Sequence, residues 1–393
     1  MKIQFKIVAF FLIISSFVFA QKEILYSKSF ETNTATTVLL ILNSGGTIEI
    51  EESEDYKFHV EYSIEFENYS TRQKEKLIKE IRNRYDIAAS MADNHITTSY
   101  ENKSNRRNAF SMDSYMNSRY IRHKKNDSLI NHKLKDAFVQ EMVETKTPKF
   151  AFTNVISNSK YLSEGRKKRA VERFGKETNA KRRPVRVKIK IPKNLNVTIN
   201  SKYTKVILKG NLKNQFSIRC NGGRLFADRF ENKTNVIKVK DGIIIMESMS
   251  GGELSLINSR QALLGTLDNL KLDSEFSKIE IGEIESNVEI TDFTSKFIVH
   301  NFSSSFNSFK MNTEYSEVNM FLPKNMSYYV ETFGNDTVHY KNGIPTEITP
   351  SGKNEPSKMM TIGKVTNPNK IKINTTHGII RLGEDSIDFG EEN

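Results

Sequence analysis

The chain has 393 residues, with 59 Lys plus Arg, 47 Asp plus Glu and a net charge of +12. This length can bury a sizeable core in about one to three domains, which excludes a small scaffold that depends on disulfides. Its one cysteine, Cys220, excludes an internal disulfide altogether. We expect a small buried residue beside a strand there, with an intermolecular disulfide or a reactive thiol as the alternatives.

Residues 1–20 have the three regions of a secretory signal peptide. Lys2 and Lys6 give a positive start, residues 7–20 are apolar, and Val18 and Ala20 are small residues that favour cleavage before Gln21. A membrane span needs about 20 apolar residues, and this run is shorter. The cleavage site has no cysteine for a lipid anchor, and no later segment has transmembrane length. The sequence therefore predicts export to the periplasm, the outer cell surface or the medium.

Residues 21–67 are expected to form strands. Residues 38–50 have the pattern of a strand, a turn at Asn43-Ser44-Gly45-Gly46 and a second strand. Residues 56–66 alternate apolar and polar side chains as a further strand. We expect these strands to join the repeats of the C-terminal half.

Residues 68–184 are predicted to be a basic insertion that is partly helical or disordered. A helix is expected over residues 71–85, because Leu77, Ile78, Ile81 and Tyr85 share one helical face. A weaker helix is expected over residues 127–143. Their narrow apolar stripes favour packing against the rest of the protein over binding to a membrane surface.

The insertion accounts for the whole positive charge. Residues 102–186 contain 22 basic and 8 acidic residues. Such a segment in an exported protein favours an anionic envelope glycan, lipopolysaccharide or an acidic protein as its partner, and a solvated loop without a partner is the alternative. Nucleic acid is not expected, because the protein is exported and the sequence shows no aromatic ladder for stacking on a single strand. The predicted binding residues are Arg166, Lys167, Lys168, Arg169, Lys181, Arg182 and Arg183.

Residues 185–393 contain a repeat. Two apolar residues one position apart recur after a turn of about six residues, as in Val197 and Ile199 followed by Val206 and Leu208. Units begin at Val197, Phe216, Ile237, Leu254, Leu270, Val288, Phe309 and Tyr329, and a last one at Ile371. This period is typical of the coils of a β-solenoid, in which short parallel strands stack and alternate side chains fill a continuous core.

The repeat is imperfect in places. The unit at Ile237 is short, and Gly265 stands where the unit at Leu254 needs its last apolar residue. Residues 341–358 contain Pro345, Pro350 and Pro356 and are read as a loop. The prediction is an all-β, single-stranded parallel β-solenoid (β-helix) with a partly helical basic insertion. An antiparallel sandwich is the alternative.

The run Val187-Lys188-Ile189-Lys190-Ile191-Pro192-Lys193-Asn194-Leu195-Asn196-Val197, with the following Asn200-Ser201-Lys202-Tyr203-Thr204-Lys205-Val206, resembles the entry to the putative-adhesin β-solenoid family of bacterial envelope proteins. The closing run from Asn374 to Ile380 is similar to the family's last coil. The resemblance covers residues 185–382 and 38–50 and implies the fold and export. The basic insertion departs from the family pattern.

Chemical motifs are sparse. The sequence has no phosphate-binding glycine loop, zinc-ligand spacing or nucleophile elbow, and its seven histidines are scattered, so we expect no metal, cofactor or catalytic residue. The acidic residues Asp273, Glu275, Asp292 and Glu314 stand at turn positions. Asp273 and Asp292 in adjacent coils would suit a polysaccharide lyase or glycosidase on a β-helix, if both faced one groove.

The leading functional hypothesis is an exported, non-catalytic, adhesin-like scaffold for interactions at the cell envelope or surface. The alternative is a carbohydrate-active enzyme. A component of an envelope-stress system is a third candidate, which no residue of the sequence supports directly.

Overall fold

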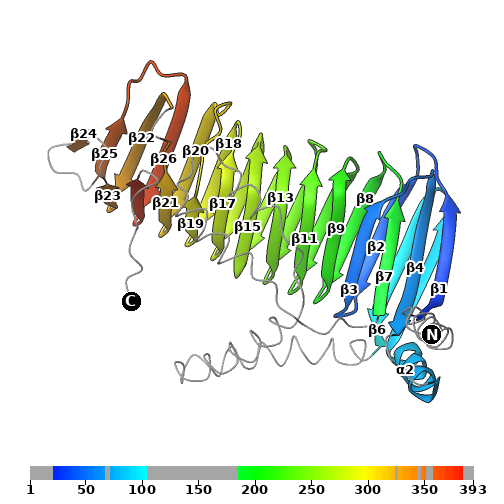
Figure 1. Cartoon of the computed structure of the whole chain (residues 1–393). Coiled ribbons are helices and arrows are strands. Elements are labelled where there is room, and N and C mark those ends of the chain that lie inside the picture. Colours follow the sequence, from blue (N-terminus) through cyan, green and yellow to red (C-terminus); the bar gives the residue numbers. More distant parts are fainter. Residues whose placement is uncertain are drawn as a thin grey trace, which may run out of the picture.

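A computed structural model of the chain describes residues 21–66, 71–103, 185–323, 326–342, 347–350 and 357–383. The described part is all-β apart from the helix α2 (Thr71–Arg84), and it contains two large sheets (Figure 1). Most neighbouring strands in both sheets run parallel. The prediction of an all-β fold is confirmed, and the antiparallel sandwich is wrong.

Sheet A has 13 strands. Its order is β1 (Gln21–Glu31), β4 (Lys57–Phe66), β7 (Val185–Ile191), β3 (Thr47–Glu52), β9 (Lys205–Leu212), β11 (Arg224–Phe230), β13 (Ile243–Ser250), β15 (Gln261–Asp268), β17 (Lys278–Ile284), β19 (Lys296–Val299), β21 (Glu317–Phe321), β27 (Ile379–Gly383) and β23 (Val338–Asn342). The antiparallel pairs are β1 with β4 and β4 with β7.

Sheet B has 14 strands. Its order is β24 (Glu347–Pro350), β25 (Ser357–Ile362), β22 (Tyr328–Asn335), β26 (Asn369–Thr376), β20 (Ser308–Glu314), β18 (Val288–Phe293), β16 (Leu270–Glu275), β14 (Glu253–Ile257), β12 (Val236–Lys240), β10 (Gln215–Asn221), β8 (Asn196–Lys202), β2 (Thr37–Asn43), β6 (His95–Asn102) and β5 (Tyr85–Ala92). Antiparallel pairs occur only at its two ends.

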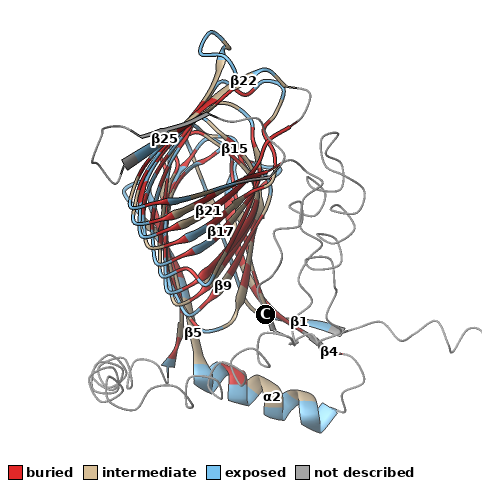
Figure 2. Cartoon of the chain, turned by 90° about the vertical axis from the view of Figure 1, so that its left-hand side faces the viewer, coloured by how far each residue is buried: buried red, intermediate tan, exposed pale blue. Residues whose placement is uncertain are grey.

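From β8 to β21 the chain alternates between the sheets, and each strand pairs with the strand two places along the chain. We call a strand of sheet B and the following strand of sheet A a rung. Successive rungs stack in parallel, and the two sheets face each other across a buried interior (Figure 2). Each rung therefore contributes one strand to each wall of the molecule.

The parallel register places equivalent apolar residues above one another. Ile218 lies between Ile199 and Ile237, and the same column continues along sheet B. Its members are buried in one continuous core, and each fully buried side chain contributes about 1.5–3 kcal/mol through removal from water. The column comprises Leu40, Ile199, Ile218, Ile237, Leu254, Leu272, Ile290, Met311 and Ile373.

The unit at Leu254 departs from the repeat in two ways: its strand register is shifted, and Ala262 stands where a larger apolar residue was expected. Leu254 pairs with Leu272, not with Leu270 as expected from the spacing of the units. The missing apolar pair of that unit is Ala262 and Leu264, both buried. Gly265 lies one residue beyond this pair, where a Cβ atom would overlap the carbonyl oxygen of Glu247. Close contact between backbones thus explains why glycine stands there.

The C-terminal units do not stack in sequence order. β26 lies between β20 and β22, so Phe309 pairs with Ile371, and β22 is placed outside β26. In β22 the inward residues are Val330 and Thr332, one position later than the expected start at Tyr329. The stretch read as a loop over residues 341–358 also contains β24, which pairs with β25.

The N-terminal strands join the same stack, as predicted. β2 pairs with β8, β3 pairs with β9, and the chain returns at β7 between β3 and β4. The helix predicted over residues 71–85 is α2, with Ile81 buried and Leu77 and Ile78 packed against the core. Two strands inside the expected insertion were not predicted: β6 pairs with β2, and β5 with β6. The helix expected over residues 127–143 lies outside the described residues.

Cys220 is buried in β10, which agrees with the expected structural role. Burial raises the pKa of its thiol to about 11. The thiol therefore stays protonated at neutral pH, and neither an intermolecular disulfide nor a reactive thiol fits its position.

Four rungs carry apolar side chains on the outer face of sheet A as well. Ile207, Phe226, Ile245 and Leu263 are register neighbours and alternate with the core residues of their strands, yet all are buried. The ammonium group of Lys205 lies 4.8 Å from the centre of the Phe226 ring. Burial, with Arg224 nearby, lowers the pKa of Lys205 to about 8. Sheet A is thus buried on both faces along these rungs.

In the part of the chain that the structure describes, no helix combines the length and the apolar character needed to cross a membrane.

The inward and outward positions of one strand provide a stability test. Ile290, which is 0% exposed, should lose about 2–5 kcal/mol of unfolding free energy in the variant Ile290→Ala, because a cavity opens between Leu272 and Met311. Its exposed neighbour in β18 provides the control: Glu289→Ala should change stability by no more than about 0.5 kcal/mol. Denaturant unfolding followed by circular dichroism measures both. Equal effects would contradict the assigned facing of β18.

Candidate binding surface

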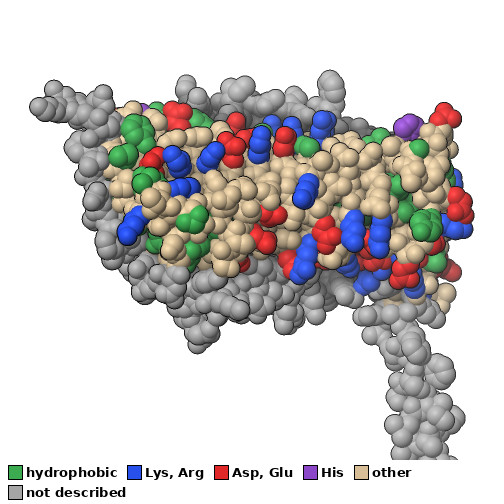
Figure 3. All heavy atoms as spheres, turned by 90° about the horizontal axis from the view of Figure 1, so that it is seen from above, with side chains coloured by type: hydrophobic (Ala, Val, Ile, Leu, Met, Phe, Trp, Pro, Cys, Tyr) green, Lys and Arg blue, Asp and Glu red, His purple; other side chains and the backbone are tan. Residues whose placement is uncertain are grey.

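The predicted basic binding residues Arg166, Lys167, Lys168, Arg169, Lys181, Arg182 and Arg183 lie outside the described residues. On the face shown in Figure 3, the described Lys and Arg side chains are interspersed with Asp and Glu. This face therefore carries mixed charge.

The acidic residues considered for catalysis do not converge. Asp273 pairs in register with Thr291, and Asp292 pairs with Ser274. Because neighbouring positions of a strand face opposite sides, Asp273 is exposed on the outer face while Asp292 is buried inside. Glu275 and Glu314 are exposed at the ends of β16 and β20. Asp273 and Asp292 therefore do not face one groove, which was the condition for the carbohydrate-active enzyme.

Exposed aromatic rings gather instead at the corner where the chain leaves sheet B for sheet A. Phe276, Phe293, Tyr315 and His377 follow or end the neighbouring strands β16, β18, β20 and β26. The ring centroids of Phe276 and Phe293 are 5.5 Å apart, and those of Phe293 and Tyr315 are 6.0 Å apart, both edge to face. His377 stacks on Tyr315 at 4.9 Å. We call these four residues the aromatic ladder.

The ladder is open to solvent. Phe276 is 55% exposed, Phe293 is 38% exposed and Tyr315 is 53% exposed. An isolated exposed ring needs no explanation, but a contiguous row of rings marks a surface able to bind a partner. Aromatic pairs in these geometries also hold one another in place.

The backbone at the corner is left-handed. Phe276, Tyr315 and His377 have φ values of 48°, 55° and 52°. Other rungs make the same turn with Gly222 and Asn258, which adopt this conformation at lower cost. Bulky side chains are rare in this region of φ, so the turn itself does not require the rings of Phe276 and Tyr315.

A row of hydroxyl groups fixes the corner from inside. Ser277, Ser295 and Ser316 follow the turn residues of successive rungs and are buried. The backbone N–H of Ser277 donates to Ser295 Oγ at 3.0 Å, and that of Ser295 donates to Ser316 Oγ at 3.0 Å. Backbone bonds connect the turns as well, as from Phe276 N to Phe293 O at 3.0 Å and from Tyr315 N to Thr376 O at 2.9 Å.

Asp292 anchors this row. Its carboxylate accepts hydrogen bonds from Ser274 Oγ at 2.5 Å, Ser316 Oγ at 2.5 Å and Thr313 Oγ1 at 2.9 Å. These donors come from both neighbouring rungs and from the turn after β20. A buried carboxylate bonded in this way is a structural element, and it holds the backbone that carries Phe293.

The surroundings of the ladder are acidic or neutral on the sheet B side, while the exposed Lys278 and Lys296 begin the following strands of sheet A, with Lys296 paired to Glu317 at 3.2 Å. Glu275 and Glu314 lie in the same outward column as Phe293, and Asp336 lies 3.5 Å from His377. The next outward column of sheet B contains Asp273, Thr291, Asn312, Asn374 and Phe333, all exposed, with Asn374 Nδ2 donating to Asn312 Oδ1 at 2.9 Å. Rings and neutral polar groups therefore lie side by side.

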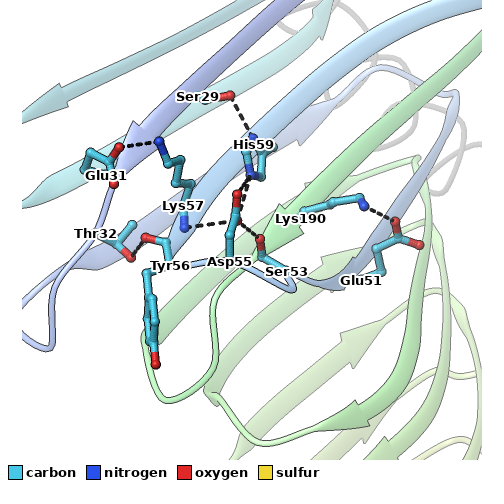
Figure 4. A network of polar contacts seen from close by, with 10 residues as sticks. All are labelled: Ser29, Glu31, Thr32, Glu51, Ser53, Asp55, Tyr56, Lys57, His59 and Lys190. Atoms are coloured by element: carbon cyan, nitrogen blue, oxygen red, sulfur yellow. Dashed lines mark hydrogen bonds and ion pairs between the residues drawn. The ribbon is translucent and has the colours of Figure 1, made fainter.

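A second polar cluster lies at the N-terminal end, around the turn between β3 and β4 (Figure 4). Ser29 Oγ lies 2.7 Å from His59 Nδ1, and His59 Nε2 lies 2.9 Å from Asp55 Oδ1. Ser53 Oγ donates to the same Asp55 oxygen at 2.5 Å. These bonds lower the pKa of Asp55 to about 2, with the Ser53 hydroxyl as the main cause and His59 next.

The order serine, histidine, aspartate invites comparison with a hydrolase triad. In such triads a buried aspartate orients the histidine. Here the side chains of Asp55 and His59 are 49% and 31% exposed, and Ser29 lies on the edge strand β1, so water competes for each group. The cluster is better described as a surface network that fixes the turn.

Among the residues that the structure describes, no three His, Cys, Asp or Glu side chains gather to hold a metal ion.

Sequence reasoning missed the aromatic ladder and the Asp55 cluster. Phe276, Phe293 and Tyr315 are about one repeat apart in the chain and His377 follows about three repeats later, so only the pairing between strands brings the rings together. The sequence signal was present, since Phe276 and Tyr315 occupy the turn position that Gly222 and Asn258 occupy in other rungs.

Removal of the buried carboxylate tests the anchoring role. Asp292→Ala leaves three hydroxyl groups without their acceptor and should lower the unfolding free energy by about 1–3 kcal/mol. Asp273→Ala, on the outer face of the neighbouring strand, should stay within about 0.5 kcal/mol of the wild type. Thermal unfolding and denaturant unfolding measure the change in unfolding free energy for both variants. A stable Asp292→Ala protein would contradict the structural assignment.

The Asp55 cluster makes a pH-dependent prediction. A carboxyl whose folded pKa is lowered stabilises the fold above its unfolded value near 4, and the contribution is lost as the pH falls toward 2. Ser53→Ala should raise the pKa of Asp55, as measured by carboxyl ¹³C chemical shifts in an NMR titration. Ser29→Ala keeps both direct partners of Asp55 and should move its pKa much less. The reverse ranking would show that His59, oriented by Ser29, controls the carboxyl.

Comparison with known proteins places the chain in no family, since no family model and no curated protein matches it. A solved structure of a putative cell adhesion protein from Clostridium sporogenes matches at 12% identity, over 93% of this chain and 100% of that one, with a TM-score of 0.20. At this identity and TM-score the similarity shows neither a family nor a function.

Proposed function

We propose that the protein is an exported, non-catalytic β-solenoid that serves as an adhesin-like scaffold for interactions at the cell envelope or surface. The carrying observation is the row of exposed aromatic rings fixed along one corner of stacked parallel rungs. The alternation of strands between two sheets, with residue-for-residue parallel register, supports the solenoid. The signal-peptide pattern of residues 1–20 supports export.

Several observations favour binding over catalysis. Asp292 is occupied by three hydroxyl donors, and Asp273 faces away from it. A glycosidase needs two carboxyl groups on either side of one bond. The pair named for the carbohydrate-active enzyme, Asp273 and Asp292, therefore lacks the arrangement that this alternative requires.

The basic segment is the second part of the proposal. Residues 166–169 and 181–183 carry seven positive charges in two short runs. In an exported protein they are suited to an anionic envelope glycan, lipopolysaccharide or an acidic protein, through an attraction that salt screens.

Binding of the mature protein to lipopolysaccharide tests this proposal. The variant in which Arg166, Lys167, Lys168 and Arg169 become Gln should lose most of the binding, and wild-type binding should weaken as salt rises. A variant with Lys238, Lys240, Lys271 and Lys310 changed to Gln provides a matched control, because it removes the same charge from exposed positions of the stack.

Surface plasmon resonance at several salt concentrations measures the affinity of the wild type and of both variants for lipopolysaccharide. Equal weakening by both variants would assign binding to general positive charge. Absence of binding by the wild type would remove lipopolysaccharide as a partner of this segment.

A further inference from the structure

We infer that the aromatic ladder binds an uncharged polysaccharide that lies along the axis of the stack. This inference rests on the proposed function, since it names the ligand class of a surface on the same scaffold. The ladder comprises Phe276, Phe293, Tyr315 and His377 on four neighbouring strands of sheet B.

The first argument is geometric. Strands of a sheet repeat every 4.7–4.9 Å, so the ladder extends over about 14 Å along the stack. Its centroid separations of 5.5, 6.0 and 4.9 Å leave no gap in which a ring would be missing. A linear polymer can contact every ring only if it runs parallel to this axis. A small ligand would leave most of the ladder unused.

The second argument concerns the chemistry of the contacts. The face of an aromatic ring carries negative charge density, and the C–H groups of a pyranose ring present partial positive charge to it. The column of Thr291, Asn312 and Asn374 adds neutral hydroxyl and amide groups beside the rings. Amides both donate and accept, as sugar hydroxyl groups do. Tyr315 and His377 stack on each other and the other pairs meet edge to face, so the rings offer both edges and faces to a ligand. With the adjacent amides, they suit a sugar polymer better than an aliphatic surface.

The third argument is charge. Among described residues on the sheet B side of the corner, the two outward columns and the turn position from β16 to β22 contain Asp273, Glu275, Glu314 and Asp336 and neither Lys nor Arg. On the sheet A side, Lys278 and Lys296 begin the following strands and are exposed. On the sheet B side these carboxylates would repel the phosphate groups of a nucleic acid or of lipopolysaccharide, whereas an uncharged chain would not be repelled. Base stacking on the rings is therefore the less favoured occupant.

The fourth argument is the free-energy cost of the left-handed backbone conformation at the corner. Phe276 and Tyr315 hold left-handed conformations that Gly222 and Asn258 adopt more easily in other rungs. The serine row and Asp292 hold this strained corner in place. A preorganised row of rings loses little conformational entropy when a ligand binds, which favours affinity.

Affinity electrophoresis tests the inference directly. Native gels run toward the cathode suit a chain with a net charge of +12, and they can contain hydroxyethyl cellulose, dextran or a soluble β-glucan. Wild-type protein should be retarded by at least one of these uncharged polymers. The double variant Phe276→Asn/Tyr315→Asn should bind roughly tenfold to a hundredfold more weakly, because two stacking contacts are lost.

The chain provides a matched control. Tyr203 is 53% exposed, as is Tyr315, and has a φ of 52° at the equivalent corner of an earlier rung. It lies outside the ladder, so Tyr203→Asn should leave retardation unchanged. Asn tolerates the left-handed conformation, and unchanged melting curves would confirm that all variants fold.

The outcomes separate this inference from the proposed function. No retardation of the wild type by any uncharged polymer, with lipopolysaccharide binding intact, would overturn the ladder's ligand and leave the scaffold function standing. If Tyr203→Asn weakened polysaccharide binding as much as the double variant does, the inference would also be overturned. Binding of single-stranded DNA that the double variant abolishes would replace the polysaccharide with a nucleic acid.

Discussion

The structure depends on the parallel hydrogen-bonded register between rungs. Because each backbone strand bonds to the equivalent strand of the next rung, residues about one repeat apart in the sequence become direct neighbours. An apolar residue such as Ile218 therefore needs apolar residues above and below it, which Ile199 and Ile237 provide. The same rule applies along most of the interior, so the core is a set of columns, and a polar group placed in one of them is enclosed on both sides.

One inward column of sheet B shows how a polar group satisfies this rule. Cys220, Val239 and Leu256 are followed by Ser274 and Asp292, so the column turns polar where it meets the corner. Asp292 is tolerated because the register places hydroxyl donors on the neighbouring rungs. The resulting network fixes the turns that follow β16, β18 and β20, and those turns present the rings to solvent. Burial of one carboxylate and exposure of three aromatic side chains are thus two consequences of the same stacking.

Much of this architecture could be predicted from the sequence, because pairs such as Val197 and Ile199 repeat at a regular interval and face inward. The prediction was wrong where a small residue stands in place of a large one, as at Ala262. It was also wrong where the order of strands in the sheet differs from their order in the sequence, as at β26. Periodicity finds strands but not which strand lies beside which. The strands β5 and β6 were missed because the surrounding charge pattern suggested an insertion. The ladder was missed because Phe276 and Tyr315 are adjacent only through β18, and Asp292 was misplaced because an acidic residue near a turn suggests exposure.

The aromatic corner and the basic segment differ in the physics of their contacts. Charge attraction by residues 166–183 acts over roughly a Debye length, about 8–10 Å, and weakens with salt, whereas stacking on Phe293 acts only at contact and responds little to salt. The segment leaves the described chain after Lys103 and returns at Val185, on strands near β2 and β3, while the ladder begins at β16. About 20 Å of stacked strands separates β8 from β16. The two proposed contacts therefore differ in their response to salt, so that each can be measured while the other is unchanged.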